Sequence, residues 1–221
     1  MANKQVAVIG LGRFGISTTR TLYNLGYDVL AIDINEERVQ AALGQCTYAV
    51  TADCTSEIAL KDLGIQDYEV VIITIQNDVA PSVMISVLMK TLGVTNVIGR
   101  ARDSLHANTL RRVGVDRVIQ PEEEMGTRLA HSLYNASVEE YIGITNNYGV
   151  SRFRVPARFS GKTLEEVGFT SASDSYGIAA LALCKGRKIT LNPSLSEKVK
   201  EGHLVVVAAH DSDLESLEKV T

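Results

Sequence analysis

Short apolar runs alternate with longer amphipathic stretches over the first 120 residues. The first run, 6–9, stops at a glycine; a stretch with apolar positions at helical spacing follows, and a second run covers 29–32. A strand whose two faces are covered reads as a continuous apolar run, whereas a helix on the sheet repeats its apolar positions about every 3.6 residues. Six such alternations predict an α/β fold built on a doubly wound, Rossmann-like parallel sheet.

Punctuating residues set the ends of these elements. Asn35, Thr55 and Asp103 are predicted helix N-caps, because their short polar side chains can accept from the first free N–H groups. Pro81 fits the first turn of a helix over 79–92. The predicted strands are 6–9, 29–32, 48–52, 70–75, 97–101 and 117–120.

The pattern changes after residue 120. A helix over 122–134 has no parallel strand after it, and 137–142 is predicted to be a second helix start or a crossover. From residue 144 apolar Val150, Phe153 and Val155 alternate with arginines, as in half-buried antiparallel strands. The further elements predicted here are a helix over 161–167, a hairpin of 178–184 with 188–191, a strand over 203–209 and a terminal helix capped by Asp211. The predicted domains are therefore 1–120, a linking helix over 121–141 and a small α+β domain over 142–221.

A glycine-rich turn follows the first predicted strand. Gly10, Gly12 and Gly15 form GxGxxG between strand and helix, and Asp33 ends the next strand eighteen residues further on. In this context the first glycine allows the tight turn, the second lets backbone approach a phosphate, and the third allows close helix–strand packing. The helix N-terminus offers free N–H groups to that phosphate, and Asp33 can accept from ribose hydroxyls. The sequence therefore predicts a nucleotide site.

Several residues near this turn have two interpretations. Arg13 either binds phosphate oxygens with its planar fork or is a solvated residue of the first helical turn. Asp53 either caps a helix or contacts adenine. Cys54 either has a thiol pKa lowered by a helix N-terminus or is a small buried residue. Asp33, an acid rather than a base, disfavours the 2′-phosphate of NADP.

Composition narrows the class of protein. The 221 residues carry a formal net charge of −4 and an isoelectric point near 5.6, which argues against a nucleic-acid partner. No apolar run reaches the roughly 18 residues of a membrane span. The chain enters its first strand almost at once, so no signal peptide is expected. Three widely spaced cysteines suit the reduced thiols of a cytoplasm. No Ser/His/Asp, Cys/His or metal-ligand spacing is present, so binding is expected rather than catalysis.

Four stretches together resemble a known family: AVIGLGRFG, VLAIDINEERV, the acid–Cys–Thr turn at Asp53, and RVIQPEEEMG. They resemble the RCK (KTN) domains of bacterial potassium transport, as found in Ktr-type regulatory subunits. The resemblance covers residues 4–120 as the N-lobe, 121–141 as a swapped crossover helix and 144–221 as the TrkA C-terminal domain.

This resemblance implies a non-enzymatic regulator. Family members form octameric rings, built from dimers, beneath a dimeric membrane potassium channel subunit of the KtrB or KtrD type. ATP and ADP compete for the N-lobe and set different ring shapes. The protein is expected in the cytoplasm, peripheral on the inner face of the membrane. An NAD(H)-binding regulator and an NAD-dependent oxidoreductase are the alternatives.

The resemblance also implies particular site residues. The nucleotide-binding set is Gly10, Gly12, Arg13, Phe14, Gly15, Asp33, Ile34, Asp53, Cys54, Thr74, Ile75, Gln76, Arg100, His106 and Glu122. Arg13 corresponds to the residue that senses the terminal phosphate. Glu122 corresponds to an acid beside the phosphates, which implies a bridging Mg²⁺ or Ca²⁺, because a carboxylate otherwise repels a triphosphate.

A second ligand site is implied in the C-terminal domain. Family C-lobes bind cyclic di-AMP, and Ile178, Leu183, Asn192 and Pro193 match that site. Cys184 stands where the family has arginine. From the residues alone, the neighbouring hairpin tip at 185–187 is either solvated or part of a ligand site.

Overall fold

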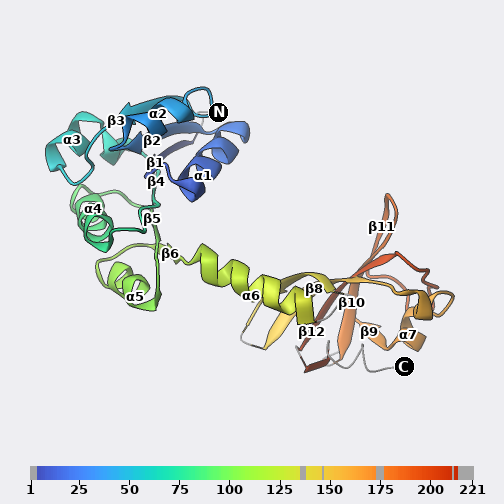
Figure 1. Ribbon diagram of the computed structural model, residues 1–221. Coiled ribbons are helices and arrows are strands. Elements are labelled where there is room, and N and C mark those ends of the chain that lie inside the picture. The colour runs from blue at the N-terminus through green and yellow to red at the C-terminus, as the bar shows by residue number, and fades with distance from the viewer. Residues whose placement is uncertain (1–3, 135–137, 146, 173–176, 211, 214–221) are drawn as a thin grey trace. The chain divides into compact units, whose positions relative to one another are not determined.

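The computed structural model describes residues 4–134, 138–145, 147–172, 177–210 and 212–213. The chain divides into two compact units, 1–121 and 122–221. Each unit has its own six-stranded sheet (Figure 1).

The first unit is a parallel sheet in the order β3-β2-β1-β4-β5-β6. Central β1 pairs on both sides, so that Ile9 lies opposite Ile32 of β2 and Ile73 of β4. Its elements are β1 (Gln5–Ile9), α1 (Arg13–Asn24), β2 (Asp28–Asp33), α2 (Glu36–Ala42), β3 (Tyr48–Thr51), α3 (Glu57–Asp62), η1 (Ile65–Asp67), β4 (Val70–Ile73), α4 (Val79–Thr91), β5 (Val97–Arg100), α5 (Ser104–Arg112) and β6 (Arg117–Ile119). The predicted doubly wound sheet is confirmed.

Helices cover both faces of this sheet, which explains the continuous apolar runs. Along β1, Val6 and Val8 belong to the buried cluster that includes residues of α2, with α1 packed against it. Ala7 and Ile9 point the other way, into the cluster with buried residues of α3, α4 and α5. Strand β1 is therefore apolar at every position from Val6 to Ile9.

Two of the three predicted N-caps in this unit are confirmed. Asn35 and Asp103 accept from the backbone N–H three residues further on, at 3.0 and 2.9 Å. The prediction for Thr55 is wrong, because Ser56 caps α3 while the Thr55 hydroxyl donates to Asp53. Strand β4 ends at Ile73 rather than residue 75; the N–H of Thr74 still donates to Ile9 O, and the chain then turns toward α4.

The second unit is mostly antiparallel, with strand order β11-β10-β12-β8-β7 and β9 pairing in parallel with β10. Its elements are α6 (Pro121–Tyr134, beginning at the last residue of the first unit), β7 (Val138–Gly143), β8 (Tyr148–Arg154), η2 (Ala157–Phe159), α7 (Leu164–Val167), β9 (Phe169–Ser171), β10 (Ile178–Lys185), β11 (Lys188–Leu191) and β12 (Leu204–His210). Phe153, Phe159 and Leu183 are fully buried in its core. The predicted hairpin and final strand are confirmed.

Two expectations in this unit are corrected. Residues 138–142 belong to strand β7, not to a helix or crossover. The acidic pair in this strand suggested a helix start. In the structure, Glu139 instead forms ion pairs with Arg152 and Arg154 of β8. The second correction concerns the alternation in β8. Val150 was grouped with the apolar positions Phe153 and Val155, but it lies on the half-buried face with Arg152, and Ser151 faces the core instead.

Two further differences concern a short strand and the last helix of the second unit. Strand β9 was not predicted, since three residues are too short for a periodic signal. Asp211 and the terminal helix that it was expected to cap, apart from residues 212–213, lie outside the described residues.

Candidate nucleotide site

The glycine turn between β1 and α1 is tightly folded. Gly10 has a φ of +96°, and its N–H donates to Ile32 O at 2.8 Å. A Cβ built on Gly15 would lie 1.9 Å from Gly10 O, so no side chain fits there. A Cβ on Gly12 would meet no described atom within 4 Å, and Gly12 begins α1 without a side-chain cap. The space beside Gly12 is therefore open, and the first N–H groups of α1 lack a side-chain cap, as close approach of a phosphate requires.

Side chains from β2 and from the residue after β4 hold this turn. Asp33 is 4% exposed, and its Oδ2 accepts from Leu11 N at 2.6 Å. The Thr74 hydroxyl donates to Gly10 O at 2.5 Å. Both residues were predicted to contact nucleotide, and the structure gives each a contact with the turn itself.

Asp33 has two further partners. Its Oδ1 accepts from Asn35 N at 2.9 Å, and Arg38 Nη1 lies 3.4 Å from Oδ2. A carboxylate has about four lone-pair positions, so Asp33 retains acceptor capacity for ribose hydroxyls. Arg38 was not predicted as a partner of Asp33. The sequence does place it in the first turn of the capped helix α2, five residues after Asp33, and this spacing could have indicated the contact.

The turn after β3 is held by Asp53. Its Oδ1 accepts from Thr55 N at 2.9 Å and from the Thr55 hydroxyl at 2.6 Å, and these bonds lower the Asp53 pKa. Asp53 is therefore not the helix cap. Cys54 is 5% exposed, and burial raises its thiol pKa to about 12. The alternative of a reactive thiol is wrong, and Cys54 is a packed residue.

Polar groups gather after β4 and on α5. His106 is 2% exposed, and its Nδ1 accepts from Arg102 N at 3.2 Å, so the neutral ring carries its proton on Nε2. Burial lowers the His106 pKa. Among the described residues, neither His106 Nε2 nor Gln76 Oε1 has a hydrogen-bond partner. Buried polar atoms of this kind mark a place for water or ligand.

The cationic and apolar members of the predicted set line the same edge. Arg13 is exposed at the first position of α1. The Arg100 guanidinium carbon lies 5.0 Å from the centroid of the Phe14 ring, so the end of β5 contacts the start of α1. Ile34 is 70% exposed directly after Asp33. Ile75 is half-buried and packs against the core beneath the site.

Glu122 is exposed and lies in the second unit. Its place beside the phosphates and its role as a metal ligand stay predictions. Within the described residues, no group of three or more His, Cys, Asp or Glu side chains could hold a metal. No helix in the same part of the chain has the length and apolar character needed to span a membrane.

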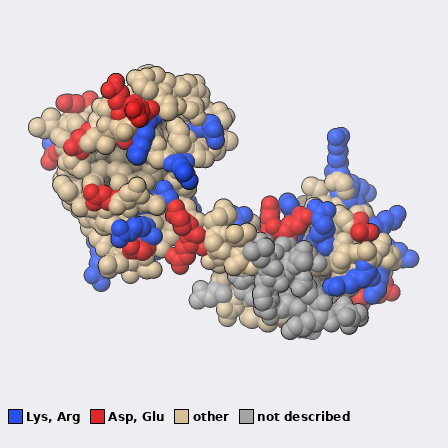
Figure 2. Space-filling model, in the orientation of Figure 1, with Lys and Arg blue, Asp and Glu red and all other residues tan. Residues whose placement is uncertain are grey.

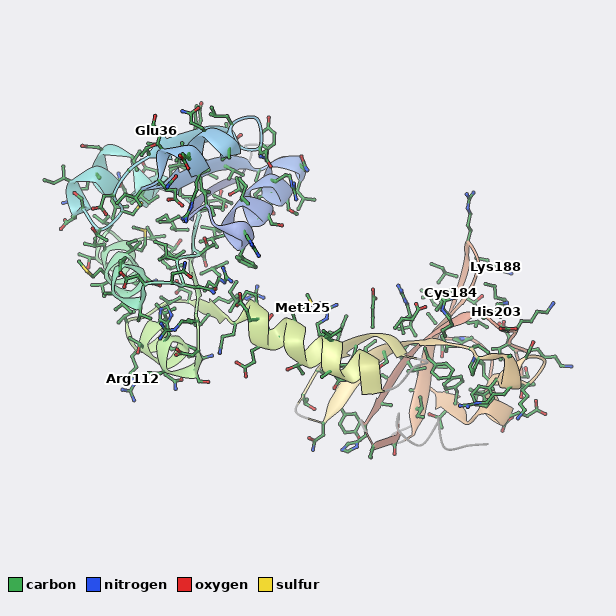
Figure 3. All side chains as sticks on the ribbon, in the orientation of Figure 1. Glu36, Arg112, Met125, Cys184, Lys188 and His203 are labelled. Carbon is green, nitrogen blue, oxygen red and sulfur yellow. The ribbon has the colours of Figure 1, made fainter. Side chains whose placement is uncertain are left out.

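The residues of the predicted second site have mixed environments. Ile178 and Leu183 are buried in the core of the second unit, and Pro193 is buried as well. Asn192 is exposed with a φ of +46°, and its N–H donates to Leu181 O at 2.8 Å. Basic side chains stand at the tip of the neighbouring hairpin (Figure 2), and Cys184 and Lys188 lie along it (Figure 3).

The Rossmann-like sheet and its glycine turn define a nucleotide-binding domain of the TrkA-N kind. Residues 6–121 match the TrkA-N domain family, and the chain belongs to this family, within the RCK group.

Curated relatives match nearly the full length of the chain, among them two Ktr proteins. The Ktr system potassium uptake protein A of Bacillus subtilis (strain 168) is 35% identical over 98% of this chain and 96% of its own. The corresponding protein A of Vibrio alginolyticus is 35% identical over 96% of this chain and 95% of its own.

Solved structures share the fold at low sequence identity. The GsuK RCK domain matches with a TM-score of 0.65 at 16% identity, over 99% of this chain and 48% of that one. The GsuK channel bound to NAD matches with 0.64 at 17% identity, over 99% and 39%. GsuK bound to ADP matches with 0.50 at 14% identity, over 62% and 35%.

Proposed function

We propose that the protein is the nucleotide-sensing regulatory subunit of a Ktr-type potassium-uptake system. In this proposal it assembles from dimers into an octameric ring on the cytoplasmic face of the membrane. The ring binds a dimeric channel subunit of the KtrB or KtrD type, and ATP and ADP set its conformation. The proposal rests on the glycine turn, which Asp33 and Thr74 hold by hydrogen bonds, and on Arg13, which is exposed at the first position of the helix after it. The near full-length similarity to the two Ktr proteins supports the potassium assignment.

The proposal includes no catalysis. Cys54 cannot serve as a nucleophile near neutral pH, because its thiol pKa is about 12. The side chains of Asp33, Asp53 and Thr74 are engaged with the backbone of the site's turns. The arrangement suits recognition of a bound nucleotide better than proton transfer to a substrate.

Discrimination between ATP and ADP is assigned to Arg13. Only ATP has a third phosphate beyond the reach of the backbone turn, and an exposed guanidinium at the first helical position can follow it. Glu122 is assigned a bridging Mg²⁺ or Ca²⁺. A ligand gates only if it binds two ring states with different affinities, so ATP and ADP must prefer different states.

Calorimetric titration with ATP, ADP, NADH and NADPH tests the ligand assignment. ATP and ADP should bind and NADPH should bind much more weakly. Arg13→Ala should weaken ATP more than ADP by about 1–3 kcal/mol, as expected for a charge-assisted contact. Arg20→Ala, which removes an exposed arginine from the same helix, is the matched control. Preference for NADPH over both adenine nucleotides would refute the assignment.

The cation and gating roles need separate measurements. Glu122→Gln should abolish the dependence of ATP affinity on Mg²⁺ or Ca²⁺, while Glu123→Gln, at the next position of α6, should keep it. In proteoliposomes that hold the partner channel, ATP should raise potassium flux relative to ADP, and Arg13→Ala should erase the difference. Unchanged discrimination and cation dependence in both variants would overturn the gating mechanism.

An NAD(H)-sensing regulator is the second candidate. His106 Nε2 and Gln76 Oε1 are buried without described partners on the β4–β5 side, where the second nucleotide of a dinucleotide lies in this fold class. The GsuK channel bound to NAD shares the fold. Gln76→Leu should weaken NADH but leave ADP unchanged if a dinucleotide is the native ligand.

Cyclic di-AMP at Ile178, Leu183, Asn192 and Pro193 is a further part of the proposal. Among these residues Asn192 has the exposed polar side chain, so Asn192→Ala should weaken binding. If calorimetric titration of the unmodified protein with cyclic di-AMP shows no heat of binding, this ligand is removed from the proposal.

A further inference from the structure

The residue after β4 continues the sheet and then contacts the glycine turn. Thr74 is 5% exposed. Its N–H donates to Ile9 O at 2.9 Å, and its Oγ1 lies 2.5 Å from Gly10 O and 3.2 Å from Ile9 O. A hydroxyl has one proton to donate, so the shorter contact, to Gly10, is the principal hydrogen bond.

The hydroxyl of Thr74 is enclosed by the turn. A Cβ built on Gly15 would lie 2.7 Å from Thr74 Oγ1, and one built on Gly10 would lie 3.0 Å from it. The oxygen is thus packed between the first and third glycines. It is directed at the protein backbone and not at a phosphate above the turn.

Asp33 binds the same peptide group from the opposite side. The carbonyl that accepts from Thr74 belongs to Gly10, and the N–H that donates to Asp33 belongs to Leu11. These two atoms are the two ends of one planar peptide unit. β2 and β4 flank β1, so one strand supplies the acceptor and the other leads to the donor.

We propose that Thr74 is a positioning residue which, with Asp33, fixes the orientation of the Gly10–Leu11 peptide and thereby the phosphate-binding N–H groups after it. Rotation of this peptide would break both bonds and leave a buried carboxylate and a buried hydroxyl without these partners. The inference rests on the proposed nucleotide function and assigns Thr74 a role in phosphate recognition without contact to the ligand.

Thr74→Val removes the hydroxyl and keeps the shape, whereas Thr74→Ser keeps the hydroxyl. Titration of the full-length protein with adenosine, ADP and ATP should show Thr74→Val weakening ADP and ATP about tenfold, the fold-change of one ordinary hydrogen bond. Adenosine, which has no phosphate, should bind as before. Thr74→Ser should bind all three within about twofold of the unmodified protein. Equal losses for adenosine and ADP, or unchanged ADP affinity, would overturn the proposal.

Two further measurements keep the inference separate from folding and from the proposed function. Amide exchange of Leu11 without ligand should accelerate in Thr74→Val, and unchanged protection would overturn the role. If Thr74→Val does not fold, Thr74→Ala replaces it with the same expectations. The losses from Thr74→Val and Asp33→Asn should be less than additive, because both act on one peptide. Absence of nucleotide binding by the unmodified protein would refute the proposed function. The exchange result would still show whether Thr74 and Asp33 fix the Gly10–Leu11 peptide.

Discussion

At the scale of single residues, the three thiols have different environments. Cys46 and Cys54 are buried, whereas Cys184 is half-buried on β10. Burial raises the pKa of both buried thiols, that of Cys54 to about 12. Thiolate is the reactive form, so the raised pKa and the burial both slow the reaction of Cys46 and Cys54 with alkylating reagents.

We therefore expect iodoacetamide at pH 8 to modify Cys184 long before Cys54. Raising the pH should not make Cys54 reactive until the solution approaches its pKa or the protein unfolds. Mass spectrometry of peptides after timed alkylation measures both sites, with protein in guanidinium chloride as the control in which all three react. Rapid alkylation of Cys54 in the folded protein would contradict the burial of this turn.

At the scale of elements, one carboxylate ties α4 to β5. Asp116 Oδ2 accepts from Val97 N at 2.7 Å and from Lys90 Nζ at 2.9 Å, and Lys90 also donates to Val94 O at 3.2 Å. The Val97 backbone bond, followed by the Lys90 bond, lowers the Asp116 pKa.

Asp116→Ala should lower the free energy of unfolding at pH 7 by about 1 kcal/mol, a value reduced for solvent screening because the side chain is partly exposed. Since the folded pKa is below the unfolded one, this contribution is complete above the unfolded pKa of about 3.9 and is lost as pH falls through the folded pKa. Urea unfolding at pH 7 and at pH 3 measures both. Asp62→Ala, at an exposed carboxylate at the end of α3, is the control. An equal difference between variant and parent at both pH values would contradict the assignment.

The same scale shows what could be predicted from the sequence. The central parallel strands β1, β2 and β4 were predictable because nearly all their residues are buried, and the glycine turn was predictable because its chemistry is local. Strand β7 was not, since its acids Glu139 and Glu140 pair with Arg152 thirteen and twelve residues away. The position of Thr74 in the site was predicted, but its contact with Gly10, 64 residues away, depends on the strand order.

At the scale of the whole molecule, α6 exposes an apolar stripe. Every described side chain from 122 to 130 is exposed, including Met125 at 59% and Leu129 at 58% (Figure 3 labels Met125). These residues lie four apart, on one face of the helix. We expect another copy of the chain to cover this face.

Light scattering at micromolar concentration should therefore find a dimer or a larger assembly. Met125→Asp with Leu129→Asp should reduce the mass toward that of one chain while circular dichroism keeps the helical signal. Glu123→Lys with Thr127→Lys places charges four residues apart on another part of the helix and is the control. A monomer of 23.9 kDa for the unmodified protein would refute this expectation.

Among the described residues, each of the three buried clusters lies wholly within one of the two units. A protein built this way need not melt in one cooperative step, and its calorimetric enthalpy should exceed the van't Hoff value. A nucleotide bound at the glycine turn stabilises the first unit by about 2.7 kcal/mol at a free concentration one hundred times Kd. The heat-capacity trace should then separate into two peaks, of which ADP raises the temperature of one. The ligand thus becomes a label that tells which unit each peak belongs to.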